Sequence, residues 1–155
     1  MSVSSDARFG HVNLVAHDWR ALAAFYVAHF GCRLVPPERD YSGPQLAAGT
    51  SVAGAALRGA HLRLPGHGPD GPTLEIYQYS DELPRPAAAA NRVGYGHIAF
   101  SVDDVDSLRR DVLAAGGSAV GDIVTLRTSD GRPVTWCYVT DPEGNIIELQ
   151  SWADA

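Results

Sequence analysis

One short pattern occurs twice in the sequence and constrains the fold more than any other feature. The N-terminal half contains GHVNLVAHD and the C-terminal half contains GHIAFSVDD, so His11 and His97 each follow a glycine and open an alternating strand. Gly31 and Gly117 end the helical patterns that come next, and they are 86 positions apart, as the two histidines are. The chain is therefore predicted to consist of two similar halves.

Hydrophobic periodicity predicts the elements of the first half. Alternation over residues 11–16 precedes an amphipathic helix, which Asp18 caps and Gly31 ends. The Pro- and Gly-rich residues 36–54 are predicted to form a long excursion that serves as a lid or rim. Its charged stretch either closes over a substrate or stays exposed, and it comprises Arg39, Asp40 and Tyr41. Further strands are expected at 32–35, 55–64 and 73–79.

The second half repeats this order after a linker rich in Pro and Ala at about 81–93. Glu148 lies 73 positions after Glu75, so the first half holds 13 extra residues, which we place in 36–54. We expect one domain over 1–155, made of two β-α-β-β-β modules. The expected ranges are about 9–80 for module 1, about 94–152 for module 2, 103–115 for the second helix, and 119–126, 134–140 and 146–152 for the last strands.

Four polar residues occupy equivalent places in the two halves. His11 and His97 open the first strand of each half, and Glu75 and Glu148 lie within the last. Alternation places all four on the sheet face opposite the aliphatic residues that a helix covers. If the two sheets curl toward one another with the helices outside, these side chains point into one cavity. Two imidazoles and two carboxylates suit one divalent ion, such as Fe, Mn, Co, Ni or Zn.

Other polar residues are candidates for substrate binding. Most of them share the face of the metal-ligand candidates and would orient a substrate or the ligands, although each could equally be a solvated sheet residue. They are Asn13, Tyr77, Tyr79, Ser101 and Gln150. His61, on the third strand, either lines the pocket or satisfies local hydrogen bonds.

Composition excludes several classes of function. A net charge of −6 without a cluster of basic residues argues against binding a nucleic-acid backbone. All 12 basic residues are arginine, so no lysine is available as a Schiff base. No apolar run reaches the roughly 20 residues that span a bilayer, and the first residues lack a signal-peptide core, so a cytoplasmic location without membrane contact is expected. Cys32 and Cys137 form no CxxC pattern and are expected as free thiols.

These motifs resemble the vicinal oxygen chelate superfamily of glyoxalase I, epimerases, extradiol dioxygenases and bleomycin-binding proteins. GYGHIAFSVDD and DPEGNIIEL are similar to its second-half signatures, and GHVNLVAHDWRALAAFY to its opening. The resemblance implies an α+β fold in which paired βαβββ modules form an open, curved mixed-sheet barrel with helices outside, and it implies a homodimer. It also implies the metal ligands His11, Glu75, His97 and Glu148, with Glu148 as base and Glu75 as its counterpart.

The resemblance leaves three functions open. A metal-dependent isomerase or lyase of the glyoxalase or epimerase type, acting by proton transfer on a small chelated substrate, is favoured because all four ligand positions are filled. The first alternative is an Fe(II) extradiol ring-cleaving dioxygenase, and the second is a small-molecule binding or resistance protein. Val15 stands where bacterial glyoxalase I has an arginine, which disfavours glutathione thioesters, and the absence of lysine disfavours coenzyme A.

Overall fold

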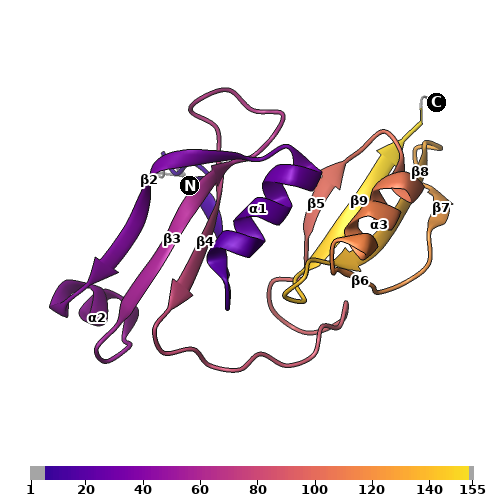
Figure 1. Cartoon of the computed structure of the whole chain (residues 1–155). Helices are drawn as coiled ribbons and strands as arrows, with labels where there is room; N and C mark the ends of the chain where they lie inside the picture. The colour runs from indigo at the N-terminus through magenta and orange to yellow at the C-terminus, as the bar shows by residue number, and fades with distance from the viewer. Residues whose placement is uncertain (1–5, 154–155) are drawn as a thin grey trace, which may run out of the picture. The chain divides into compact units, whose positions relative to one another are not determined.

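The computed structural model describes residues 6–153, and the chain divides into two compact units, residues 1–82 and 83–155. Each unit contains one open mixed sheet with a helix packed on one face (Figure 1). The described residues form three helices, and no sheet closes into a barrel. The predicted α+β class is thus confirmed. No described helix has the length and apolar character needed to cross a membrane.

The first unit is a four-stranded sheet in the order β1-β4-β3-β2. β1 runs parallel to β4, and the other pairs are antiparallel. A helix, α1, packs against β3 and β4. The elements are β1 (His11–Val15), α1 (Trp19–Phe30), β2 (Arg33–Ser42), α2 (Pro44–Thr50), β3 (Ala56–Arg63) and β4 (Thr73–Tyr79).

Local sequence explains where α1 begins and ends. The Asp18 carboxylate accepts a hydrogen bond from the Ala21 backbone N–H, and Gly31 closes the helix in the left-handed region at a φ of 68°. The large side chains of α1 face the sheet, and Tyr26 is fully buried, as are Leu74 and Ile76 on β4. Burying side chains of this size is the main stabilising contribution, about 2 kcal/mol each. The other face of β4 is left to its polar residues.

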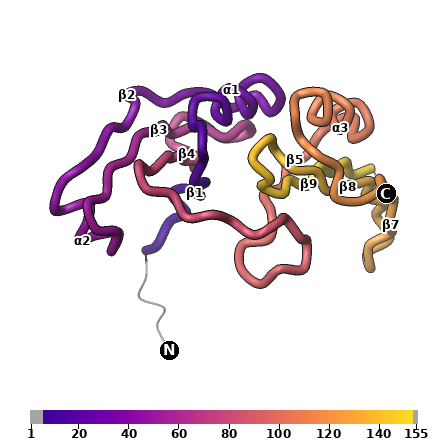
Figure 2. The backbone as a smooth tube through the Cα atoms, turned by 60° about the horizontal axis from the view of Figure 1, so that its bottom comes forward, coloured from indigo at the N-terminus to yellow at the C-terminus, as the bar shows by residue number. Residues whose placement is uncertain are grey.

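The prediction of a long excursion over 36–54 is wrong. β2 continues to Ser42 and pairs with β3 along most of its length, and α2 follows it (Figure 2). Prolines do not prevent this strand, because β2 is an edge strand and its register shifts between Val35 and Arg39, where both prolines lie. Arg39 consequently belongs to the sheet, paired with Gly59, and not to a lid.

The second unit repeats the arrangement with one broken strand. Its sheet has the order β5-β9-β8-β6, and β7 also pairs with β8. The single strand predicted at about 119–126 is two strands, because Gly121 and Asp122 interrupt the pairing with β8. The elements are β5 (Ile98–Ser101), α3 (Val105–Ala114), β6 (Ser118–Ala119), β7 (Val124–Arg127), β8 (Pro133–Thr140) and β9 (Ile146–Trp152).

Close packing fixes α3 on this sheet. The Asp104 carboxylate caps the helix by accepting from the Ser107 N–H, and Val112 is fully buried. A Cβ at Gly117 would lie 2.3 Å from the Thr140 carbonyl oxygen, so only glycine permits this approach of the chain to β8. Residues 80–97, between β4 and β5, form no helix or strand (Figure 2). Within this segment, Arg85 donates to the Asn145 side chain at 2.7 Å.

Strand register defines which residues of the two units are equivalent. His61 pairs with Glu75 on β4, and Tyr138 pairs with Glu148 on β9. The offset between the halves is thus 86 residues at the first strand, 77 at the third and 73 at the last. Nine of the 13 extra residues therefore precede β3, and four lie in the β3–β4 turn, which corrects their placement in 36–54 alone.

Candidate functional site

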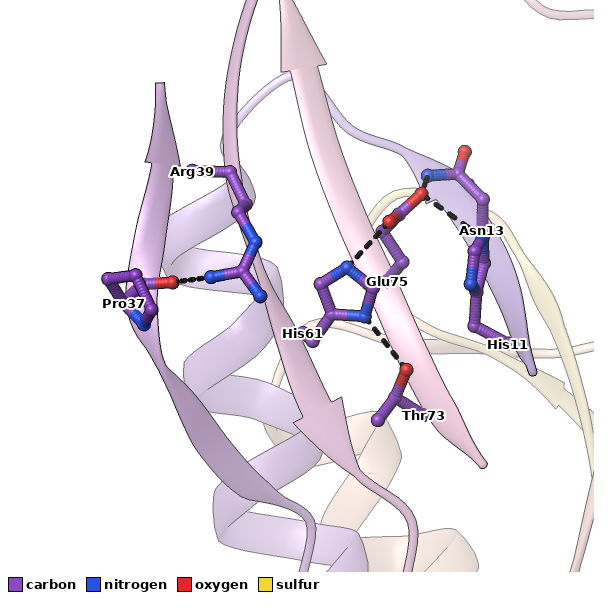
Figure 3. A network of polar contacts seen from close by, with 7 residues as sticks. All are labelled: His11, Asn13, Pro37, Arg39, His61, Thr73 and Glu75. Carbon is purple, nitrogen blue, oxygen red and sulfur yellow. Dashed lines mark hydrogen bonds and ion pairs between the residues drawn. The ribbon is translucent and has the colours of Figure 1, made fainter. Parts of the chain in front are cut away.

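Glu75 is the centre of a polar cluster on the open face of the first sheet (Figure 3). Only 8% of this residue is exposed. Asn13 Nδ2 donates to Oε1 at 2.9 Å, His61 Nε2 lies 2.7 Å from Oε2, and His11 Nε2 lies 3.6 Å from Oε1. A buried carboxylate without partners would cost several kcal/mol, and these contacts compensate for that cost. They also hold both oxygens in fixed positions.

The orientation of the His61 ring is fixed through Nδ1, the nitrogen that does not face Glu75. Nδ1 lies 2.8 Å from Thr73 Oγ1, so Nε2 faces the carboxylate. Burial lowers the pKa of His61, and the charges of Arg39 and His11 lower it further, although Glu75 opposes the shift. The His61 and His11 rings meet edge to face with centroids 5.4 Å apart. A metal-ligating histidine is usually held through one ring nitrogen by an outer partner while the other nitrogen binds the metal, and Thr73 holds His61 through Nδ1 in this way.

Tyr77 adds a phenol to the same cluster. Burial, followed by a hydrogen bond to Glu75, raises the pKa of Tyr77 well above its usual range. Its hydroxyl therefore stays protonated at neutral pH and can donate to the carboxylate.

His11, His61 and Glu75 could hold a metal ion together. One nitrogen from each imidazole and one carboxylate oxygen lie within 4.8 Å of one another. Two imidazole nitrogens and a carboxylate oxygen suit Zn, Fe, Mn, Co or Ni better than Ca or Mg, which prefer all-oxygen sets. Three protein ligands would leave coordination positions open for a substrate.

The second unit carries a smaller polar group at the equivalent place. His97 Nε2 lies 2.9 Å from Glu148 Oε2, and the Tyr138 ring packs on the His97 ring with centroids 4.8 Å apart. Burial raises the pKa of Tyr138, and the charge of Glu148 adds to the increase. Beside this pair, Gln150 Nε2 lies 3.5 Å from Ser101 Oγ, at the limit of a hydrogen bond. The group therefore contains one histidine and one carboxylate.

The contacts join the candidate residues into one set in each unit. Asn13, Tyr77 and His61 lie around Glu75 with His11, whereas Tyr79 is half-buried on β4 two positions beyond Tyr77. Ser101 and Gln150 lie beside the pair of His97 and Glu148 on β5 and β9. That both sets serve one metal site stays a prediction.

Sequence reasoning missed two members of these sets. Neither Thr73, which orients His61, nor Tyr138, which packs on His97, is among the residues predicted from the sequence for the site. Antiparallel pairing about the glycine-rich turn would have placed His61 opposite Glu75, because both lie seven residues from Gly68. No comparable signal marked Thr73.

Comparison with known proteins places the chain in a family. The sequence model of the Glyoxalase/Bleomycin resistance protein/Dioxygenase superfamily matches residues 8–149, nearly the whole chain. The chain belongs to this superfamily. The superfamily description names enzymes as well as a resistance protein, so membership alone does not distinguish catalysis from binding. A search of the curated proteins found no match.

Solved structures of this superfamily show the same fold. A glyoxalase-family protein from Bacillus cereus is 20% identical with a TM-score of 0.82, and the alignment covers 99% of each chain. A superfamily domain from Frankia sp. is 18% identical with a TM-score of 0.60, covering 97% of this chain and 96% of that one. A glyoxalase-family protein from Enterococcus faecalis is 22% identical with a TM-score of 0.57, covering 94% and 98%. At such identities the likeness concerns the fold.

Proposed function

We propose that this protein is a divalent-metal enzyme that promotes proton transfer on a small, oxygen-chelating substrate, in an isomerase or lyase reaction. The observation that carries the proposal is the buried Glu75 carboxylate, which two imidazoles and an amide surround. Such a cluster has more nitrogen and oxygen donors than strand packing requires, and it lies on the sheet face that α1 leaves open.

The residues present fit a metal ion. In the first unit His11 and Glu75 would hold it, and His61 offers a third donor. His97 and Glu148 are proposed to complete the set from the second unit, as the superfamily resemblance implies. A bound divalent ion would act as a Lewis acid that polarises a substrate carbonyl and stabilises developing negative charge.

The two carboxylates differ in a way that supports different roles for them. Both Glu75 oxygens are held by neighbours, which suits a fixed ligand. Glu148 contacts His97 through Oε2 alone among the described residues, and its side chain is 19% exposed against 10% for Glu75. Glu148 is therefore the better base. It accepts the proton from the carbon beside the substrate carbonyl and returns it to the isomerised carbon.

Metal content and hydrogen exchange test this proposal together. Protein purified without chelator is analysed for metal, and deuterium incorporation at C3 of 2-oxopentanoate is followed by NMR in D2O. We expect stoichiometric metal and exchange in the wild type. Glu148→Gln should keep its metal and lose exchange by about a hundredfold or more, as expected for removal of a general base.

Glu38→Gln is the matched control, because Glu38 is an exposed carboxylate that pairs only with Arg20 in the described structure. This variant should behave as the wild type. If no metal binds at any pH after metal addition, the metal enzyme proposal is wrong and a sequestering protein is favoured. Undiminished exchange in Glu148→Gln would refute the role of this residue as base.

A ring-cleaving oxygenase is the second candidate, and one observation favours it. His11, His61 and Glu75 form a set of two histidines and one carboxylate, the ligand set of many non-haem Fe(II) oxygenases. Oxygen uptake with catechol after anaerobic loading with Fe(II) would support this function, and His61→Ala should abolish the uptake. Deuterium exchange without oxygen uptake would favour proton transfer.

A further inference from the structure

Arg39 lies on the same sheet face as the Glu75 cluster. It pairs with Gly59 on β3, and Gly59 pairs with Tyr77 on β4. Directly paired residues of antiparallel strands point to the same face, and the adjacent row contains His61 and Glu75. Figure 3 shows Arg39 on the strand beside His61. The guanidinium is thus placed at the border of the candidate metal site.

Gly59 is the β3 residue that lies between Arg39 and the cluster. A Cβ at Gly59 would lie 2.5 Å from Cδ1 of Tyr77, so the Tyr77 ring covers this position in place of a β3 side chain. Only the buried backbone of Gly59 lies between Arg39 and Tyr77 in this row.

Arg39 is half-buried and has no carboxylate partner in the described part of the chain. Its one hydrogen bond there is from Nη1 to the carbonyl oxygen of Pro37, on its own strand. A guanidinium has five N–H donors, so most of its capacity is unused. Other arginines differ: Arg20 pairs with Glu38 and Arg58 pairs with Asp40.

We propose that Arg39 binds a carboxylate of the substrate, which makes the substrate a small organic acid whose carboxylate is distal to its metal-chelating oxygens. This inference rests on the proposed metal enzyme. A guanidinium fork binds a carboxylate through two parallel hydrogen bonds, which would orient the substrate relative to the metal. Tyr77, which lies in the same row as Arg39, would line the path between Arg39 and the metal.

Two acids that differ only in the distal group test this inference. 2-Oxoglutarate and 2-oxopentanoate share a five-carbon chain and the same chelating oxygens, but only the first has a distal carboxylate. Binding of each acid to metal-loaded protein, freed of excess metal, is measured by calorimetry. We expect 2-oxoglutarate to bind about tenfold or more tightly than 2-oxopentanoate, as for one charge-assisted contact.

Arg39→Gln should remove this preference, and Arg39→Lys, which keeps the charge without the fork, should retain part of it. Arg58→Gln is the matched control, because Arg58 lies on the neighbouring strand and pairs with exposed Asp40. Circular dichroism and metal content are measured on every sample. If fully metal-loaded protein binds the two acids equally, or binds neither, the inference about Arg39 is wrong. The proposed metal enzyme is not affected by either result. Absence of metal in the wild type overturns the proposed function as well.

Discussion

Each unit places a carboxylate at the equivalent point of its own sheet, and the two units surround this carboxylate differently. Glu75 has contacts to both oxygens, whereas Glu148 meets one histidine on one oxygen within residues 6–153. The backbone pairing is the same, since each glutamate pairs with the third and the first strand of its unit. The difference therefore arises from a few side chains on a common framework.

Those side chains can be compared one by one through the register. Where the first unit has polar residues around Glu75, the second has residues that give Glu148 less support. The pairs, first unit before second, are Asn13 and Ala99, His61 and Tyr138, Thr73 and Ile146, Tyr77 and Gln150, Gly59 and Trp136, and Arg39 and Val124. Under the proposed function, the first unit would fix the metal and the substrate anion, and the second would move the proton.

Removing each glutamate should give the largest contrast. We expect Glu75→Ala to weaken metal affinity by more than about a hundredfold, beyond the loss typical of an outer-shell partner, because it removes the best-held ligand. Glu148→Ala should weaken affinity by only about tenfold, since its ligand is less constrained before binding. Competition with a chromophoric chelator measures both. Equal losses would show that the contacts around Glu75 do not preorganise the metal site.

Gly59→Ala tests the close approach of β3 and β4 at the position where the second unit has Trp136. The added Cβ would lie 2.0 Å from the Ile76 carbonyl oxygen, which belongs to the backbone and cannot turn away. We expect a loss of about 3 kcal/mol in the free energy of unfolding, measured with urea. Gly49→Ala is the control, because nothing lies within 4 Å of its Cβ and alanine favours the helix, so stability should rise slightly. A stable Gly59→Ala would mean that β3 and β4 can separate.

Part of this arrangement could be predicted from the sequence. The last strand of each half was predicted correctly, because TLEIYQY and IIELQSW each alternate clearly after a glycine-containing turn. The segment 36–54 was not predicted correctly, because its prolines were interpreted as ending regular structure. The strand order shows that β2 lies at the edge of the sheet, where prolines are tolerated. Arg39 could not be assigned to the polar face for the same reason, since the register shift before it resets the alternation.

Thr73→Val, with Ile146→Thr at the equivalent position of the second unit, tests whether His61 needs the hydrogen bond between its Nδ1 and Thr73. Valine keeps the shape of Thr73 but removes the Oγ1 that holds His61 Nδ1, so metal affinity should fall about tenfold, as is usual for an outer-shell partner. The reciprocal Ile146→Thr should leave affinity unchanged, because Tyr138 stands where His61 does. Chelator competition again provides the measurement. An unchanged affinity in Thr73→Val would mean that His61 is not a ligand.

Ala99→Asn should produce the smallest change and tests the comparison most directly. Ala99 is exposed and pairs with Glu148 as Asn13 pairs with Glu75, so an asparagine there can donate to the carboxylate. A hydrogen bond of this kind contributes about 1 kcal/mol, which should slow deuterium exchange about fivefold at unchanged metal content, because a held carboxylate is a weaker and less mobile base. Asn13→Ala is the partner variant, which should weaken metal binding and leave the proton acceptor intact. Faster exchange in Ala99→Asn would contradict the assignment of Glu148 as a mobile base. It would show that this carboxylate is most effective when a hydrogen bond holds it, as expected for a metal ligand.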